Sequence, residues 1–495
     1  MKLEFPKHWI ECTFGQLLDY IQPGPFIVES TDYNDRYETP VLTAGKSFIK
    51  GYTNEKTGIF NKLPVIIFDD FTTATQFVNF PFKVKSSAMK ILTTTSPEIN
   101  IKFLYYLMQV TRINTDSHKR YWIGIYSKEK IQIPSSCEQK RIVAKIEELF
   151  SELDNGIAAL KTAREQLKVY RQAVLKHAFE GKLTAQWRKD NADKLESPEQ
   201  LLARIQTERE TRYQQQLDEW KQAVKHWQTN GQQGKKPSKP KQPKSLNSLS
   251  EDDFSELPRL PDGYIYTYLA NVGDLGRGKS KHRPRNDPRL FGGDYPFIQT
   301  AEVKAANRKI NSYSQTYSEF GLEQSKLWPA GTLCITIAAN IAETAFLGFD
   351  GCFPDSVVGF SAYNSVLPEY VELFIKAVRV RIESYAPATA QKNINLTTLE
   401  NLVIPYCSIN EQMKLINALE SIFSVIDKNE IEVEQALERA ESLRQSILKK
   451  AFSGQLGPQD PNDEPARELL ARIQDEKTAA KRAKKSAQSN KEQPA

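Results

Sequence analysis

The chain has 495 residues, of which 26% are charged, and its formal net charge is +6. That length exceeds one ordinary hydrophobic core, so we expect several domains. No apolar run approaches the ~20 residues that a membrane-spanning helix needs, and the N-terminus lacks the layout of a signal peptide. We therefore expect a cytoplasmic protein. The five cysteines form no CxxC pair, which argues against a structural metal site.

Residues 1–134 are predicted to form an α+β domain. Short strand-like runs alternate with turn residues between 40 and 92, and Pro97 is expected to open a helix. A closing strand is expected to end at Pro134 and to lead directly into the next segment.

Residues 135–183 form a stretch that returns at 408–456 with a constant offset of 273 residues and no gap. An internal repeat of this kind determines how the rest of the chain is interpreted. The identical pairs that matter most below are Glu138 and Glu411, Gln139 and Gln412, Asp154 and Asp427, Arg171 and Arg444, Phe179 and Phe452, and Gly181 and Gly454.

Each copy is predicted to be one long helix. Ser135-x-x-Glu138 and Ser408-x-x-Glu411 indicate capping boxes, and Gly181 and Gly454 indicate C-terminal caps. Apolar residues recur every three or four positions in a narrow seam, which predicts a coiled coil between the two copies. The seam positions are Ile142, Ile146, Leu149, Leu153, Ile157, Leu160, Leu167, Tyr170 and Val174, and Leu415, Leu419, Ile422, Ile426, Val433, Leu437, Ala440, Leu443 and Ile447.

The remaining segments repeat the same plan. Residues 184–256 are expected to be a partly helical linker rich in Lys and Pro, and residues 257–405 a second α+β domain in which Pro368 matches Pro97. Residues 406–456 hold the second long helix. Residues 457–495 are expected to give a helical piece, which shares LLARIQ with the linker, and a disordered basic tail. The chain is thus a tandem duplication.

This layout resembles the DNA-specificity (S) subunit of type I restriction-modification systems. The resemblance rests on the entry to each long helix, from Ile133-Pro134 to Gln139 and from Ile404-Pro405 to Gln412, and on the exits at 171–183 and 444–456. It covers nearly the whole chain. It implies two target-recognition domains joined by two antiparallel coiled-coil helices with internal pseudo-two-fold symmetry.

The resemblance also implies function. The chain would be a non-catalytic subunit that reads a bipartite target in double-stranded DNA with a fixed gap. It would bind two methyltransferase subunits, and restriction/translocase subunits would join the full complex. S-adenosylmethionine, ATP and Mg would belong to those partners. The spacer and partner-binding residues would be Glu138, Gln139, Ile142, Leu153, Leu160, Arg171, Phe179, Gly181, Glu411, Gln412, Leu415, Ile426, Arg444, Phe452 and Gly454.

Candidate DNA contacts are the Lys and Arg residues of turn-rich segments, which can follow phosphates, and Gln or Asn side chains, which can read adenine. The most basic segment is 276–289. The candidates are Lys46, Lys50, Tyr52, Lys83, Lys85, His118, Lys119, Arg120, Arg277, Lys279, Lys281, Arg283, Arg285, Arg308, Lys309, Gln391, Lys392 and Asn393. Taken singly, each such residue is more often an ordinary surface residue than a base reader.

Enzyme motifs in the chain are weak. Residues 273–280 match G-x-x-x-x-G-K-S, but the prolines that follow Ser280 are incompatible with the helix that a phosphate-binding loop requires. Glu302-Val303-Lys304 lacks the upstream acidic partner of a nuclease, and no methyltransferase tetrad is present. We therefore expect no catalytic residues. The alternative function is a coiled-coil adaptor that joins proteins and does not read DNA, and a third hypothesis is an ATPase that uses the 273–280 loop.

Overall fold

The computed structural model describes residues 5–489 except 46, 112, 114–119, 233–235, 241, 243–245, 247–248, 250–256, 387–392 and 458, with side chains described up to residue 479. The chain divides into two compact units, unit 1 with residues Met1–Ala163 and Glu432–Ala495, and unit 2 with Arg164–Ile431. Each unit contains one α+β domain, called domain 1 and domain 2 below, together with parts of both long helices.

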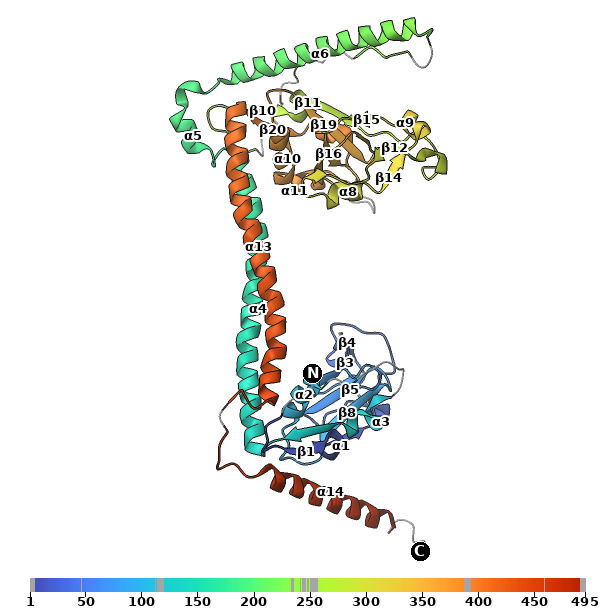
Figure 1. Cartoon of the computed structure of the whole chain (residues 1–495), viewed down its shortest axis with the longest axis vertical. Coiled ribbons are helices and arrows are strands. Elements are labelled where there is room, and N and C mark those ends of the chain that lie inside the picture. Colours follow the sequence, from blue (N-terminus) through green and yellow to red (C-terminus); the bar gives the residue numbers. More distant parts are fainter. Residues whose placement is uncertain are drawn as a thin grey trace. The chain divides into compact units, whose positions relative to one another are not determined.

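The two repeated stretches form the helices α4 (Ser136–Phe179) and α13 (Ile409–Phe452), each of 44 residues (Figure 1). Both units contain paired segments of α4 and α13, as the seam predicts, and the two helices run antiparallel, as the resemblance implies. All the predicted seam positions are buried or half-buried except Tyr170 and Leu443, which are 53% and 50% exposed. These two positions match each other at the repeat offset, so the seam prediction is wrong at the same place in both copies.

The described residues of domain 1 form three small sheets. β1 (Ile10–Thr13) pairs with β9 (Lys130–Ile133), which brings the two ends of the domain together at the start of α4. The larger sheets have the orders β2-β8-β5-β6 and β4-β3-β7. Their strands are β2 (Leu18–Ile21), β3 (Thr39–Leu42), β4 (Ile49–Thr53), β5 (Val65–Asp69), β6 (Thr75–Val78), β7 (Lys83–Val84) and β8 (Met89–Thr94); the helices are α1 (Phe14–Leu17), η1 (Gly24–Phe26), α2 (Ile101–Val110), α3 (Tyr121–Gly124) and η2 (Tyr126–Lys128).

Domain 2 repeats these strand orders with additions. β10 (Tyr264–Tyr268) pairs with β20 (Val403–Cys407), and the larger sheets are β11-β19-β16-β17-β13 and β14-β12-β18-β15. Their strands are β11 (Gly273–Arg277), β12 (Phe291–Phe297), β13 (Lys309–Ile310), β14 (Gln315–Tyr317), β15 (Leu327–Trp328), β16 (Leu333–Thr336), β17 (Thr344–Leu347), β18 (Gly351–Cys352) and β19 (Val357–Ala362); the helices are η4 (Leu269–Asn271), η5 (Pro288–Leu290), α8 (Thr300–Ala305), α9 (Glu319–Glu323), α10 (Pro368–Ala377), α11 (Arg379–Ser384) and α12 (Leu396–Glu400).

The expected match between Pro97 and Pro368 is wrong. Pro368 is the first residue of α10, whereas α2 begins at Ile101 with Asn100 as its N-cap. The Asn100 side chain accepts hydrogen bonds from the amides of Lys102 and Phe103, so a capping asparagine rather than a proline starts this helix.

The shared LLARIQ sequence lies on a helix in each unit. After α5 (Ala185–Asp190) and η3 (Ala192–Lys194), α6 (Pro198–Thr229) buries Leu201 and Ile205 in the core of unit 2. Helix α14 (Ala466–Ser489) buries Leu469 and Ile473 in the core of unit 1. Residues 477–489 are helical, so the prediction of disorder is wrong for them; 490–495 lie outside the described residues. None of the described helices is both long and apolar enough to cross a membrane.

Candidate nucleic-acid interface and subunit-docking helices

Gln139 and Gln412 attach the first turn of each long helix to its domain. The Gln139 side chain accepts from the Asn100 amide at 3.0 Å and donates to the Pro134 carbonyl at 3.2 Å. Gln412 accepts from the Leu367 amide at 2.9 Å and donates to the Cys407 carbonyl at 2.9 Å. Both side chains are fully buried. Each glutamine therefore joins the N-terminus of a domain helix to the end of the closing strand, which orients the domain on the long helix.

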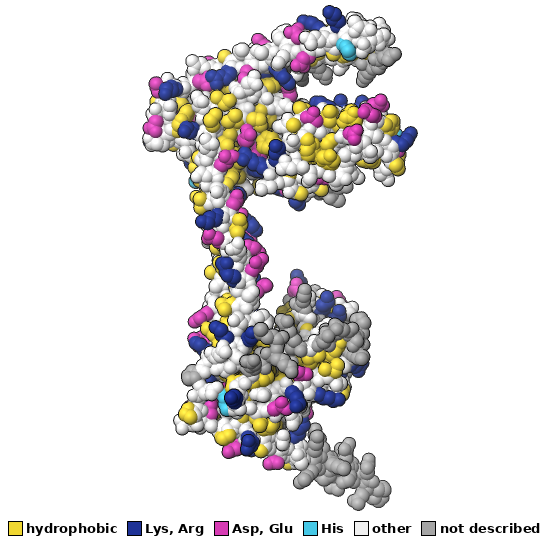
Figure 2. Space-filling view, viewed as in Figure 1, with side chains coloured by type: hydrophobic (Ala, Val, Ile, Leu, Met, Phe, Trp, Pro, Cys, Tyr) yellow, Lys and Arg dark blue, Asp and Glu magenta, His cyan; other side chains and the backbone are white. Residues whose placement is uncertain are grey.

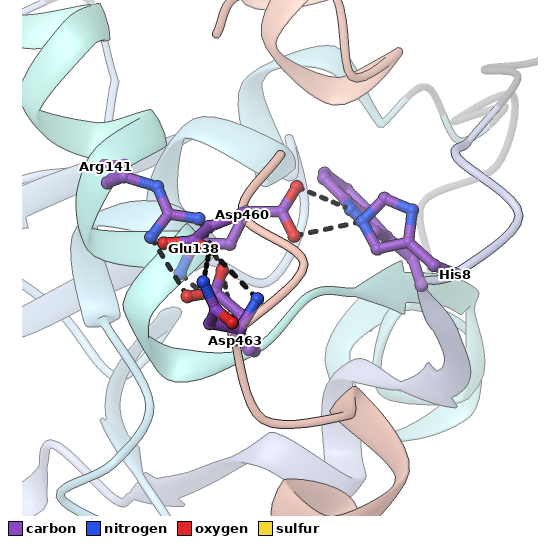
Figure 3. A network of polar contacts seen from close by, with 8 residues as sticks. His8, Glu138, Arg141, Asp460 and Asp463 are labelled. Atoms are coloured by element: carbon purple, nitrogen blue, oxygen red, sulfur yellow. Dashed lines mark hydrogen bonds and ion pairs between the residues drawn. The ribbon is translucent and has the colours of Figure 1, made fainter. Parts of the chain in front are cut away.

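The predicted capping boxes are half correct. The Ser135 and Ser408 hydroxyls accept from the amides of Glu138 and Glu411, as expected. The two carboxylates, however, are committed to other groups. Glu138 accepts from Trp9 Nε1 at 3.1 Å and meets His8 Nε2 at 3.0 Å, as Figure 3 shows. The Glu411 carboxylate binds the buried Arg188 guanidinium and the Thr184 hydroxyl.

Close to Glu138, the chain after α13 binds the start of α4. Arg141 forms a two-pronged contact with Asp463, and the guanidinium lowers the pKa of that carboxyl (Figure 3). The Ser135 hydroxyl donates to the same carboxylate at 3.3 Å. This network fixes the segment that leads from α13 to α14 within unit 1.

The predicted C-terminal caps are confirmed at both glycines. Gly181 and Gly454 have φ of +71° and +73°, and the Lys182 and Gln455 amides donate to the His177 and Lys450 carbonyls, which is a Schellman motif. A Cβ on Gly181 would lie 2.6 Å from Pro261 Cγ, and one on Gly454 would lie 2.5 Å from Pro6 Cγ. The glycines thus allow the helix end to pack against the proline that starts each domain.

A polar layer interrupts the seam at equivalent places. In unit 2, Arg171 of α4 pairs with Asp427 of α13 and lies over the Phe423 ring with its guanidinium carbon 4.9 Å from the centroid. In unit 1, Arg444 of α13 pairs with Asp154 of α4 and lies over Phe150 at 4.4 Å. The arginines enter the interhelical contact where Tyr170 and Leu443 were predicted to do so. A layer of this kind fixes the register of a helix pair.

The basic segment 276–289 of domain 2 is largely held by acceptors of its own domain. Arg277 donates to the Asp355 carbonyl, and Arg285 donates to both oxygens of the Asp355 carboxylate at 2.9 and 3.0 Å. Arg283 donates to backbone carbonyls of its own loop. Arg289 and His282 share Asp287, whose pKa is lowered chiefly by the Arg289 hydrogen bond. Of the described residues of this loop, Lys279 and Lys281 expose an ammonium group without an ion pair.

Domain 2 and the first part of α13 match a known family model. Residues 269–439 match the type I restriction modification DNA specificity domain. The specificity subunit of the Escherichia coli type I restriction enzyme EcoR124I/EcoR124II is 42% identical over 173 residues, which are 32% of this chain and 43% of that protein. The E. coli EcoBI specificity subunit is 22% identical over 493 residues, 92% of this chain and 90% of that one.

The chain is thus similar to type I specificity subunits, over residues 269–439 in the family model and over 92% of its length in the EcoBI subunit. Its match to the first of these relatives spans less than half of that protein's length. Two solved structures share the fold. One is from work on complex assembly and conformational transition of the type I R-M system, with TM-score 0.59, 14% identity and coverage of 92% of this chain and 100% of that chain. The other, the HsdS subunit from Thermoanaerobacter tengcongensis, has TM-score 0.50 and 14% identity, covering 91% and 98%.

Two of the predicted DNA contacts are instead committed to ion pairs within the protein. Lys83 is 3% exposed, donates to the Thr57 carbonyl and pairs with Glu55 at 2.5 Å, so it stabilises the interior of domain 1. Arg308 pairs with the buried Glu372 at 2.9 Å and with Glu420 of α13 at 2.7 Å. Both cations are thus paired with carboxylates of their own unit.

The other candidates stay predictions. Lys50, Lys85, Arg120, Lys309 and Asn393 have exposed side chains and Tyr52 is half-buried. Lys46, His118, Lys119, Gln391 and Lys392 lie outside the described residues. In the segment 273–280, whose sequence matches the phosphate-loop pattern, residues 273–277 form strand β11, which pairs with β19.

The spacer candidates divide by burial. Glu138, Gln139, Ile142, Phe179, Glu411, Gln412, Leu415, Ile426 and Phe452 are buried, and Leu153, Leu160, Arg171 and Arg444 are half-buried. The residues that the sequence analysis missed are Phe150 and Phe423 in the polar layer and Asp355 below the basic loop. Phe150 and Phe423 match at the repeat offset, which was the available signal; Asp355 had none.

Apolar side chains also remain exposed along the two long helices. They are Val169, Tyr170, Met413, Val425, Ile431 and Leu443, each between 49% and 70% exposed. Figure 2 shows hydrophobic side chains among charges of both signs on α4 and α13.

Proposed function

We propose that the chain is the non-catalytic DNA-specificity subunit of a type I restriction-modification complex. The observation that carries the proposal is that each unit has the same set of contacts at the ends and in the middle of its long helices, which we call the frame. The two equivalent frames support unlike domains. Gln139 and Gln412, the polar layers and the glycine caps are the same in both units, whereas domain 2 adds β13, β15 and a longer β12–β14 connection to the strand orders of domain 1. Equivalent frames with unlike domains suit a bipartite, asymmetric target in double-stranded DNA.

Each domain would read one half of the target. In domain 2, Lys279 and Lys281 would contact phosphates, which supply affinity without sequence information. Changing both to alanine is expected to lower the slope of log K against log salt concentration by about 2, since each phosphate contact contributes about 0.9. An unchanged slope would show that Lys279 and Lys281 do not contact DNA phosphates.

The long helices would fix the gap and bind partners. Each repeat exposes apolar residues, which supports two methyltransferase subunits, one for each repeat. S-adenosylmethionine, ATP and Mg would be bound by the methyltransferase and by the restriction/translocase subunits, and the complex would work in the cytoplasm. Inserting seven residues after Leu160 in α4 alone is expected to lengthen the gap or to abolish activity; an unchanged gap would contradict the spacer role.

The direct test is to express the chain with its methyltransferase subunit in a host without DNA methylation and to sequence the modified bases. Two short half-sites around a constant gap, absent when this chain is omitted, are the expected result. A stable complex without a new motif would favour the adaptor function.

A further inference from the structure

A pocket of about 510 Å³ in unit 1 lies between α2 of domain 1 and the two long helices. Tyr105, Tyr106 and Gln109 of α2 line one side, and Glu147, Phe150, Asp154 and Arg444 line the other. Gln109 donates to Thr75 of β6 at 2.5 Å, and the Tyr105 ring contacts Phe77 of β6 with centroids 6.1 Å apart. The pocket therefore borders strand β6.

The equivalent place in unit 2 is occupied by Arg308. Asn100 and Leu367 bind the matched glutamines, so Tyr105 and Glu372, each five residues later, are counterparts. Phe103 and Tyr370 support this alignment, because they contact the matched rings of Phe452 and Phe179. Glu147 matches Glu420 at the repeat offset. Arg308 pairs with Glu372 and Glu420, the counterparts of two residues that line the pocket.

The strand edge beside the pocket differs in the same way. In unit 2, β13 adds a parallel strand to β17, and the amides of Phe346 and Gly348 donate to the carbonyls of Arg308 and Ile310 at 2.9 and 3.0 Å. This strand belongs to the long β12–β14 connection, which contains α8. In domain 1 the β3–β4 connection is only residues 43–48, and β6 ends its sheet in the part of the chain that is described.

The edge of β6 that has no strand partner among the described residues presents the same donors. β6 and β17 read TQFV and TAFL, and the adjoining turns have matching hydrogen bonds, Asp69 amide to Ala74 carbonyl and Thr336 amide to Glu343 carbonyl. The register therefore makes Phe77 the counterpart of Phe346 and directs its amide away from β5. An open edge with outward amides is a template for an added strand.

We propose that the β6 edge and the adjoining pocket bind an extended, arginine-containing segment of the methyltransferase subunit, in the place that domain 2 fills with its own residues 307–310. The inference rests on the proposed function for the identity of this partner. The guanidinium would lie among the rings of Tyr105, Tyr106 and Phe150, since guanidinium groups stack on aromatic faces.

Two carboxylates would receive the guanidinium. Glu147 uses Oε1 for Lys102, and Asp154 uses Oδ1 for Arg444. The second oxygen of each has no hydrogen-bond partner among the described residues, and the two side chains are 40% and 60% exposed.

The test is hydrogen–deuterium exchange of the full chain, alone and bound to the methyltransferase subunit. The amides of Phe77 in β6 and of Asn79, which directly follows β6, are expected to exchange at least about tenfold more slowly in the complex. The Phe346 and Gly348 amides, already bonded to β13, are the internal control and are expected to be unchanged. Glu147→Arg is expected to abolish the β6 protection and to weaken the complex about 10- to 100-fold. Glu148→Arg, one position away and outside the pocket, is the matched control.

Asn79→Pro removes one edge amide at an exposed position and is expected to weaken the complex about tenfold even if Glu147→Arg disturbs folding. A complex with unchanged β6 exchange, or equal weakening by Glu147→Arg and Glu148→Arg, would overturn this inference alone. Protection that grows with the concentration of the chain by itself would assign the edge to a second copy and also overturn it. Absence of any complex would overturn the proposed function as well.

Discussion

Gly181 and Gly454 have the same conformation and the same proline neighbour in the two units, whereas the matched Glu138 and Glu411 have different partners. Glu411 is fully buried against Arg188, which follows α4 in the chain. Glu138 meets Trp9 and His8 of domain 1, and the His8 side chain is 43% exposed. Backbone geometry and the contacts between the repeats are therefore kept, while contacts to the variable segments are replaced.

The largest expected effect on stability is a difference between removing the cation that pairs with Glu411 and removing the histidine that contacts Glu138. Arg188→Met leaves the Glu411 carboxylate buried without a cation and is expected to lower the free energy of unfolding of unit 2 by about 3–5 kcal/mol. His8→Ala removes only a partly exposed partner and is expected to cost about 1 kcal/mol or less. Calorimetry of both variants measures the difference; equal costs would contradict it.

The two glycines are expected to behave alike. Gly181→Ala and Gly454→Ala each force a side chain into a left-handed conformation and against a proline ring, at a cost of about 1–3 kcal/mol. Urea titration of both variants gives the two costs. Gly457→Ala, at a position where a Cβ would meet nothing within 4 Å, is the control.

The polar layers are also expected to be equivalent, with a smaller effect. Arg171→Ala and Arg444→Ala each remove a partly exposed ion pair and a cation–π contact, worth about 1 kcal/mol together. Double-mutant cycles with Asp427→Ala and Asp154→Ala should give the same coupling energy in both units. A coupling found in one unit only would show that the repeat does not set the register equally.

The smallest effect is the acid sensitivity of α14. Arg472 lowers the pKa of Glu98 and of Glu464, and Arg141 lowers that of Asp463. Carboxyl groups with lowered pKa stabilise the folded state fully above their unfolded pKa of about 4, and this contribution is lost as the pH falls further. Pepsin cleavage at the buried Leu469 and Leu470 should therefore accelerate below about pH 4. Arg472→Ala should move this onset to higher pH; an onset independent of this substitution would contradict the assignment.

The repeat made the frame predictable from the sequence. Matched glycines, glutamines and seam residues predicted two helices, their ends and their pairing, because each signal is local and occurs twice. The seam failed at Tyr170 and Leu443 because the next residue, an arginine, stacks on a phenylalanine of the opposite helix. That preference depends on the tertiary contact and not on spacing.

The candidate DNA contacts were less predictable. Lysine and arginine usually lie on the surface, which made Lys83 and Arg308 candidates for DNA contact. In the structure they are bound by carboxylates that are distant in the sequence, namely Glu55, Glu372 and Glu420. Only the fold reveals such partners. Lys279 and Lys281 were indistinguishable in sequence from the arginines beside them, which Asp355 and Asp287 hold in place.

If domain 1 and domain 2 each recognise one half of the target independently, exchanging one domain should exchange one half-site. The most direct test replaces residues 260–407 with the corresponding segment of the EcoBI specificity subunit and determines the methylated motif of the chimera with the methyltransferase subunit. One half-site is expected to change, while the other half-site and the gap stay the same. A change in both half-sites, or in neither, would contradict independent recognition by the two domains.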